Sequence, residues 1–233
     1  MTASKVAVIA GATLGAGVGL AAAYRRRGWA VTASAATIRP SGDEDLLTVT
    51  GEVTEPAAAA RVIDAALDRF GRIDTLVNNA TVVISKPFTG YTAADFSAVA
   101  GVGLAGFFWL TQRAIAEMVV RYGGHVVTVS GTLAPAADPD TRAVLAALAS
   151  GGIEAATRSL ALEYAVCGIR VNTVSAGIIT APIGGFNGRF PPLGRTGQIS
   201  DIVDGVLLLE SAPHITGEIL HIDGGLSAGP ERW

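Results

Sequence analysis

A glycine-punctuated stretch near the start of the chain limits the possible folds more than any other. Residues 6–27 begin with an uncharged, partly β-branched run, 6–10, that has the length of one buried strand. Gly11, Gly15 and Gly17 follow, and an alanine-rich helical run comes next. Glycine allows a positive φ and a close approach of the backbone, and the free amides at a helix start attract phosphate. The stretch therefore predicts a strand–turn–helix cradle for the pyrophosphate of a dinucleotide.

The same stretch admits a second interpretation, as a membrane span. Residues 6–23 carry no charge, Lys5 precedes them, and three arginines follow at 25–27. Against this, four glycines dilute the apolar run, and the strand-like WAVTASA after Gly28 suits a βαβ unit. We therefore favour the dinucleotide cradle and expect no membrane partner.

Composition excludes several other classes. Hydrophobic residues make up 50% of the chain, a surplus that suits a parallel sheet covered on both faces or a buried subunit interface. The net charge is −3 and the only basic block is 25–27, so we expect no nucleic-acid partner. Cys167 is the only cysteine, which rules out an intrachain disulfide and favours a reducing, cytoplasmic compartment. The three histidines lack ligand spacing, so we expect no metal site.

Strand-like and helix-like patterns alternate along the chain. Strands are expected over 6–10, 29–35, 46–50, 74–77, 126–129, 169–174 and 218–222. Helices are expected after the glycine turn and over 57–70, 92–122, 141–166 and 201–210. Pro56 in a first turn, a Thr92–Asp95 capping box and a cap at Ser200 mark three helix starts. The alternation predicts one α/β domain over residues 1–233, with a doubly wound parallel sheet of the Rossmann type.

Five motifs in this order resemble those of the short-chain dehydrogenase/reductase family, along almost the whole chain. The family's TGxxxGxG turn matches residues 10–17, with alanine in place of threonine, and its NNAG motif matches 78–81. Its Asp-Val pair resembles Glu52 and Val53, its nicotinamide-flanking stretch resembles 175–180, and its C-terminal signature resembles 193–225. The resemblance implies cofactor contacts from Gly11, Thr13, Gly15, Gly17, Arg39, Glu52, Val53, Asn79, Ala80, Gly177, Ile179 and Thr180.

The resemblance also bears on the choice of cofactor. Members that prefer NAD usually carry an acid at the end of the second strand, where it binds the ribose 2′-hydroxyl. That position is Ala35 here, and the next charged residue is Arg39. An arginine near a missing acid favours NADP(H) over NAD(H), while a chain without any cofactor stays an open alternative.

The family's catalytic residues are absent. Its chemistry depends on an Asn-Ser-Tyr-Lys set, in which tyrosine transfers the proton, lysine assists it, serine holds the carbonyl and asparagine orders a water. The aligned positions in this chain are Gly103, Gly131, Ala146 and Ser150. No tyrosine lies between Tyr122 and Tyr164, so a shifted register does not restore the set.

Other polar side chains near these positions are candidate replacements. Ser130 and Thr132 flank the serine position, and Ser150 occupies the lysine position. Arg142 would share one helical face with residues 146 and 150. The acids at 138 and 140 lie on a loop expected at the pocket rim. Each of these residues also has a structural role open to it, such as strand-end hydrogen bonding or helix capping.

Three functions stay open at this point. The first is an NAD(P)(H)-dependent oxidoreductase that reduces a small-molecule carbonyl, or oxidises an alcohol, without the Tyr-Lys pair. The second is an inactive homologue that serves as a partner subunit of an active member or as a ligand-binding module. The third is a non-redox cyclase or lyase on the same scaffold. The resemblance further implies a homodimer or homotetramer formed through the helices at 92–122 and 141–166.

Overall fold

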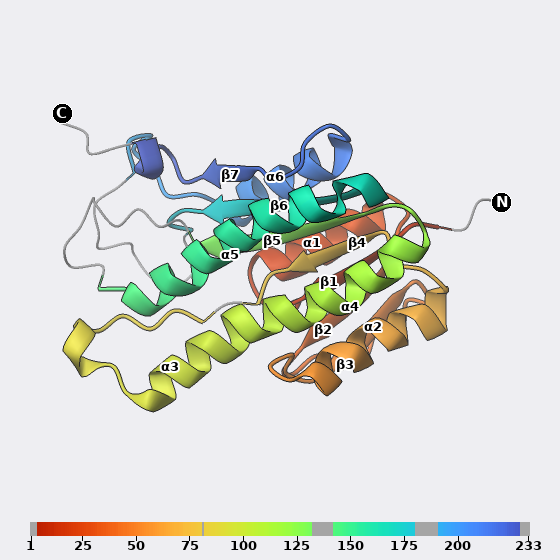
Figure 1. The fold of residues 1–233 in the computed structure, drawn as a ribbon, viewed down its shortest axis with the longest axis horizontal. Helices are drawn as coiled ribbons and strands as arrows, with labels where there is room; N and C mark the ends of the chain where they lie inside the picture. The colour runs from red at the N-terminus through yellow and green to blue at the C-terminus, as the bar shows by residue number, and fades with distance from the viewer. Residues whose placement is uncertain (1–3, 81, 132–141, 180–190, 229–233) are drawn as a thin grey trace.

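A computed structural model describes residues 4–80, 82–131, 142–179 and 191–228, and arranges them around one parallel sheet (Figure 1). Its strands are β1 Val6–Ala10, β2 Ala30–Ala35, β3 Leu46–Thr50, β4 Thr75–Asn78, β5 Gly124–Gly131, β6 Ile169–Ala176 and β7 Ile219–Ile222. Their order is β3-β2-β1-β4-β5-β6-β7, and every neighbouring pair is parallel. The predicted α/β, doubly wound fold is confirmed. The strand order reverses between β1 and β4, which is where such sheets bind ligands.

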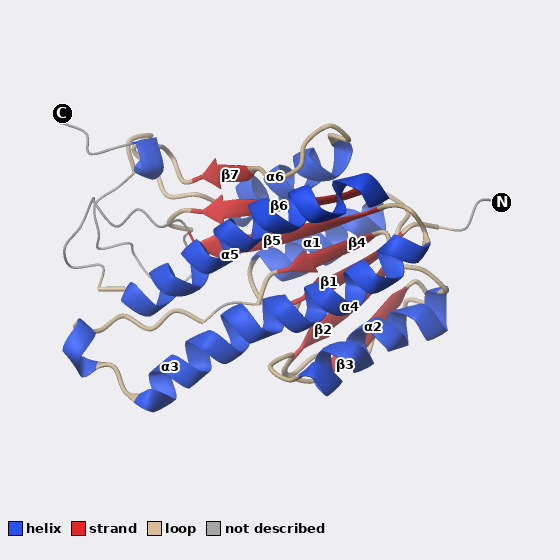
Figure 2. Cartoon of the chain, in the orientation of Figure 1, coloured by secondary structure: helices blue, strands red, loops and turns tan. Residues whose placement is uncertain are grey.

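Helices cover both faces of the sheet. They are α1 Ala16–Arg26, α2 Pro56–Phe70, α3 Ala93–Val99, the π-helix η2 Ala100–Ala105, α4 Gly106–Val120, α5 Val144–Tyr164 and α6 Ile199–Ser211, with short 3₁₀ turns η1 Phe88–Gly90, η3 Ala165–Cys167 and η4 Leu226–Ala228. In the view of Figure 2, α2, α4 and α5 lie in front of the sheet, and α1 and α6 lie behind it. Each layer of helices encloses its own apolar core against the sheet.

The membrane interpretation of residues 6–23 is wrong. This stretch is divided between β1, which is buried in the centre of the sheet, and α1, which begins after the glycine turn. By length and composition, the segment Ala93–Val120 is apolar enough to cross a membrane. In the structure its α4 part packs Leu110, Ala114 and Met118 into the front core. Since 28% of this apolar window is buried, packing against the sheet accounts for only part of its apolar composition.

Three local expectations need correction. Helix α6 is capped by Gln198 rather than by Ser200, because the Asp201 carboxylate accepts a hydrogen bond from the Gln198 amide at 2.8 Å and closes a capping box two residues earlier. Arg142 precedes α5 and has a φ of 39°, so it does not share a helical face with residues 146 and 150. The helix expected over 92–122 is α3, η2 and α4 in succession, and its start at the Thr92 capping box is confirmed.

A buried polar cluster ties the rear helices to the amino ends of the central strands. The Glu210 carboxylate of α6 accepts hydrogen bonds from Thr75 Oγ1 at 2.8 Å, and from Tyr24 Oη and His125 Nδ1 at 3.0 Å each. His125 is almost fully buried, and burial lowers its pKa. The ring is therefore neutral, with Nδ1 as the donor to Glu210 and Nε2 as the acceptor from Asn172 Nδ2 at 3.2 Å. Burial alone would raise the pKa of Glu210, but the hydrogen bonds from His125, Thr75 and Tyr24 outweigh it and lower the pKa.

Candidate dinucleotide and substrate site

The turn between β1 and α1 has the backbone shape that a pyrophosphate cradle requires. Gly11 and Gly15 adopt φ values of 73° and 55°, in the left-handed region that favours glycine. A Cβ on Gly17 would overlap the carbonyl oxygen of Gly11, so only glycine fits there. The Asn79 side chain donates to that same oxygen at 2.9 Å and fixes the turn against β4. No described side chain caps α1, and its first turn carries no acidic residue. Amides at the start of the helix are therefore available to bind an anion.

A groove of about 740 Å³ continues from this turn along α1. Ala12 and Thr13 of the turn line one end, and Arg39 and neighbouring residues of the β2–β3 connection line its wall. Arg39 is exposed, and no hydrogen bond or ion pair joins it to the rest of the described chain. Shortly after β3, Glu52 is exposed, whereas Val53 is buried. Val53 borders a second cavity, which lies around Asn78 and Phe107. Thr13 and Arg39 thus line the same groove, and Glu52 is not among its described lining residues.

The opposite end of the proposed cofactor site lies after β6. A Cβ on Gly177 would come within 2.5 Å of Asp223 Cα, so the close approach of the β6 and β7 ends depends on glycine. Ile179 forms an isolated parallel bridge with Gly197, which holds this segment beside the start of α6. Thr180 lies outside the described residues. Ala80, on the other side of the sheet's switch point, borders the substrate cavity.

The structure brings the four aligned catalytic positions together. Gly103 of η2, Gly131 at the end of β5, and Ala146 and Ser150 of α5 all line one cavity of about 40 Å³. A Cβ on Gly131 would meet nothing within 4 Å, and one on Gly103 would lie 3.5 Å from the Ala149 Cβ, an ordinary contact. The cavity is thus open at the positions where larger side chains are missing.

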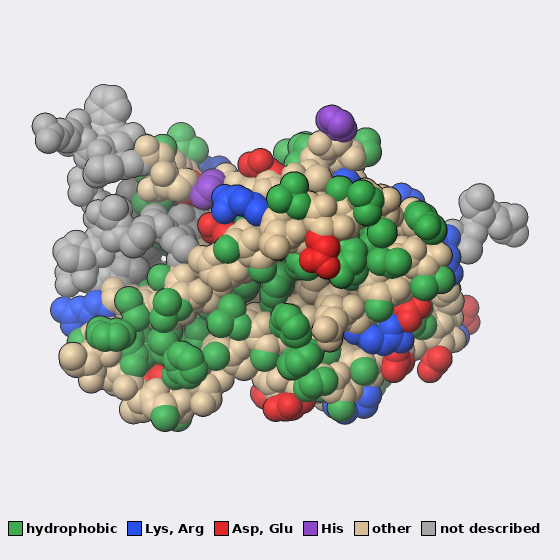
Figure 3. Space-filling model, viewed as in Figure 1, with side chains coloured by type: hydrophobic (Ala, Val, Ile, Leu, Met, Phe, Trp, Pro, Cys, Tyr) green, Lys and Arg blue, Asp and Glu red, His purple; other side chains and the backbone are tan. Residues whose placement is uncertain are grey.

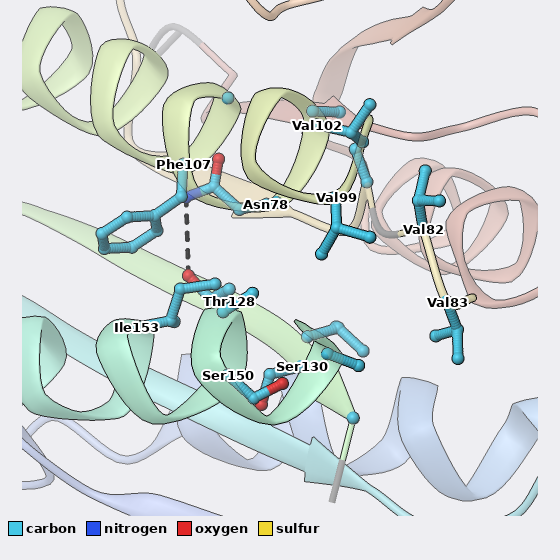
Figure 4. A pocket seen from close by; sticks show the side chains of 18 of the residues that line it. Asn78, Val82, Val83, Val99, Val102, Phe107, Thr128, Ser130, Ser150 and Ile153 are labelled. Carbon is cyan, nitrogen blue, oxygen red and sulfur yellow. Dashed lines mark hydrogen bonds between the residues drawn. The ribbon is translucent and has the colours of Figure 1, made fainter. Parts of the chain in front are cut away.

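The cavity offers hydrogen bonds but no charge. None of the described side chains that line it is ionisable. The Asn78 amide nitrogen donates to Thr111 Oγ1 at 3.0 Å. It also lies 3.5 Å from Thr128 Oγ1, the hydrogen bond that is dashed in Figure 4. Ser130 Oγ is buried on the same face of β5 as Thr128 and has no hydrogen-bond partner among the described residues. Ser130 is therefore the described hydroxyl best placed to bind a ligand.

The candidate replacements divide into three groups. Ser130 and Ser150 line the cavity, as predicted. Arg142 does not line it, and its backbone carbonyl accepts hydrogen bonds from Lys86 N and Tyr91 Oη. Thr132, and the acids at 138 and 140, lie outside the described residues. Figure 4 shows five further residues around the cavity that were not predicted as site residues: Asn78 and the valines at 82, 83, 99 and 102. Of these, Asn78 carries a sequence signal, because it opens the NNAG-like motif.

The fold and the glycine turn define a dinucleotide-binding protein of the Rossmann type. The model of the family described as enoyl-(acyl carrier protein) reductase matches residues 6–227. The chain is 33% identical, over 95% of its length and 92% of the relative, to 1,6-dihydroxycyclohexa-2,4-diene-1-carboxylate dehydrogenase of Pseudomonas putida. It is 30% identical, over 95% and 97%, to a 3-oxoacyl-acyl-carrier-protein reductase of Vibrio cholerae. The chain belongs to the short-chain dehydrogenase/reductase family.

Solved structures agree with this assignment. The 3-ketoacyl-(acyl-carrier-protein) reductase of Brucella melitensis, solved as a complex with NADH, superposes with a TM-score of 0.86 at 26% identity and covers 96% of this chain and 98% of its own. A short-chain dehydrogenase of Leptospira borgpetersenii with bound NAD+ gives the same TM-score and identity, over 96% and 93%.

Proposed function

We propose that the protein is a nicotinamide-dinucleotide-dependent oxidoreductase that transfers a hydride between the cofactor and a small carbonyl or alcohol, without the Tyr-Lys pair. One observation carries the proposal: the glycine cradle and the cavity formed by positions 103, 131, 146 and 150 lie at the same carboxyl edge of the sheet. A dinucleotide in the cradle would therefore extend toward the cavity. The names of the relatives, which are reductases and dehydrogenases, support the same reaction class.

The residues present divide the chemistry as follows. A bound nicotinamide supplies or accepts the hydride. The α1 amides and the Gly11 turn would bind its pyrophosphate, and Ile179 and Gly177 would lie beside its ring. Ser130 would donate a hydrogen bond to the carbonyl oxygen, with Ser150 close to the same cavity. The proton would come from water, because the described lining has no ionisable group. A positioned general acid contributes about 10²–10⁴-fold, so we expect a rate lower by that factor than with the tyrosine.

We further propose NADP(H) over NAD(H), on the basis of Arg39. No acid stands at Ala35, and the unpaired Arg39 guanidinium can bind a 2′-phosphate. Calorimetric titration should show NADPH binding at least about 10-fold tighter than NADH. Arg39→Gln should remove that difference, whereas Arg26→Gln, an exposed arginine at the end of α1, should keep it. Equal affinities for both cofactors in the unmodified protein would contradict the preference.

Hydride transfer is tested by following the absorbance of NADPH with a panel of neutral ketones and aldehydes. We expect slow oxidation in the unmodified protein and a rise of about 10²–10⁴-fold in the triple variant Gly131→Ser, Ala146→Tyr, Ser150→Lys, because these three side chains restore the family's serine, tyrosine and lysine. Ala57→Tyr, at an exposed position of α2, is the matched control for a large side chain. If NADPH and NADH both fail to bind, the proposal is refuted.

The uncharged cavity favours a second candidate, an inactive homologue that binds the nucleotide. Loss of every ionisable group among the described lining residues is what an abandoned proton-transfer site would show. This function predicts micromolar nucleotide binding, no turnover in the unmodified protein, and co-purification with an active family member at fixed stoichiometry. Turnover without added residues would exclude it.

We also propose self-association through α4 and α5. Exposed apolar side chains follow one line of α5, where Leu148 and Leu162 are 61% and 82% exposed with Gly152 and Ala155 between them. Phe108 of α4 is 51% exposed beside them, and Figure 3 shows hydrophobic side chains gathered over this front face. Sedimentation equilibrium should give a dimer or tetramer that Leu148→Glu dissociates, whereas Leu208→Glu on α6 should not. A monomer mass in the unmodified protein would contradict this.

A further inference from the structure

The cavity at the four aligned positions has walls that discriminate between ligands by charge. Apolar side chains from the four helical segments α3, η2, α4 and α5 and from the stretch after β4 form most of its surface: Val82, Val83, Val99, Val102, Phe107, Leu110, Ala146, Ala149 and Ile153. Figure 4 shows Val99 and Val102 on one side and Ser130 and Ser150 on the other. An anion that entered would be buried without a cationic partner from the described lining, which is strongly unfavourable.

The polar atoms that line the cavity differ in whether they already have a hydrogen-bond partner. Asn78 Nδ2 is already engaged with the hydroxyls of Thr111 and Thr128. Ser130 Oγ is buried and lacks any partner in the described chain. Buried hydroxyls in folded proteins are nearly always hydrogen-bonded, so Ser130 points to an additional group that accepts or donates one bond in the cavity.

The size of the cavity limits that group. A volume of about 40 Å³ holds roughly three water molecules, and is well below the ~150 Å³ that accommodates a benzene ring. A carbonyl with a methyl or methylene group on one side matches this space, with the remainder of the molecule outside. Its oxygen would accept a hydrogen bond from Ser130, and no charge would be buried.

We propose that the cavity selects uncharged carbonyl compounds with a short apolar substituent, and rejects those that carry a carboxylate or phosphate next to the reacting carbon. This substrate class rests on the proposed oxidoreductase function, and Ser130 is the residue that anchors the carbonyl oxygen. The selectivity arises from the uncharged walls and the unpaired Ser130 hydroxyl, so it holds for binding as well as for turnover.

Methyl pyruvate and pyruvate test this directly, since they share the same methyl ketone and differ in charge. Their affinities are measured by ligand-observed NMR, with and without saturating NADP+, so that no reduction takes place. We expect methyl pyruvate to bind at least about 100-fold tighter than pyruvate. Ser130→Ala should weaken methyl pyruvate about 3–10-fold, the effect of one hydrogen bond, and Ser159→Ala, an exposed serine of α5, should leave it unchanged.

A charge placed in the cavity gives the opposite test. Ala146→Lys should raise the ratio of the pyruvate affinity to the methyl pyruvate affinity at least about 10-fold, because both probes meet the same change in cavity size and only pyruvate gains an ion pair. The melting temperature of Ser130→Ala should equal or exceed that of the unmodified protein, because an unpaired buried hydroxyl is removed. Equal binding of the two probes, binding of neither at saturation, or unchanged methyl pyruvate affinity in Ser130→Ala would each overturn the proposal. Absence of hydride transfer alongside the expected binding would refute only the oxidoreductase function.

Discussion

Replacing Tyr24 by phenylalanine tests the energetic role of the buried Glu210 carboxylate. Tyr24 is fully buried in α1, and its hydroxyl donates to Glu210 Oε2 at 3.0 Å, while Thr75 and His125 donate to the same oxygen. A hydrogen bond to a charged group contributes about 1.5–3 kcal/mol. Because two donors remain and the aromatic ring keeps its packing, we expect Tyr24→Phe to lower the free energy of unfolding by about 2 kcal/mol. In a chain of this size that lowers Tm by about 4–8 °C.

Urea denaturation followed by circular dichroism measures this change, at one fixed protein concentration because association stabilises the folded state. Tyr122→Phe is the matched control: that tyrosine is 79% exposed, and its loss should change stability by less than about 0.5 kcal/mol. Glu210→Gln completes a double-mutant cycle. The double variant should lose about 1 kcal/mol less than the sum of the single losses, since both remove the same hydrogen bond. Strict additivity, or a Tyr24→Phe loss within 0.5 kcal/mol of zero, would refute this account of the cluster.

Two further predictions follow from the same structure. Burial lowers the pKa of His125 below its ordinary value of 6.5. The unfolded chain therefore takes up a proton first, and stability falls as the pH drops below about 6.5. His125→Gln should flatten the dependence of the urea midpoint on pH in that window; an unchanged profile would contradict this. Gly17→Ala should abolish the NADPH binding measured by calorimetry, because the added methyl group overlaps the Gly11 carbonyl oxygen. Gly42→Ala is the control and should bind NADPH normally, because a Cβ there meets nothing within 4 Å. Retained binding in Gly17→Ala would exclude the cradle geometry.

The cradle could be predicted from sequence because its requirements are local. A positive φ at Gly11 and Gly15, and the steric demand at Gly17, are properties of single positions within one strand–turn–helix unit. The positions that line the cavity could be located in the same way, by aligning residues beside Gly131 and Ala146. The alternation of strands and helices predicts a parallel sheet, whereas the strand order that brings these positions together is known only from the structure.

Other features depended on which distant residues meet. Tyr24, His125 and Glu210 come from three separate elements, and no spacing in the sequence indicates that one carboxylate would join them. The unpaired state of Ser130 is likewise decided by its neighbours, because the same residue type at a strand end usually finds a partner. Gln198 and Ser200 are both acceptable N-cap residues and lie two positions apart. The Asp201 carboxylate, which closes the capping box with Gln198, decides between them.

The buried cluster and the cavity lie at opposite ends of the same strands, and this separation has a measurable consequence. His125 and Ser130 are five residues apart on β5, or about 16 Å. Side chains more than 7–10 Å apart without shared partners contribute additively. The double variant Tyr24→Phe, Ser130→Ala should therefore change the free energy of unfolding by the sum of the single changes, within about 0.5 kcal/mol. A coupling above 1 kcal/mol would show that the two ends communicate through β5, whereas additivity would show that substitutions in the cavity and in the cluster affect stability independently.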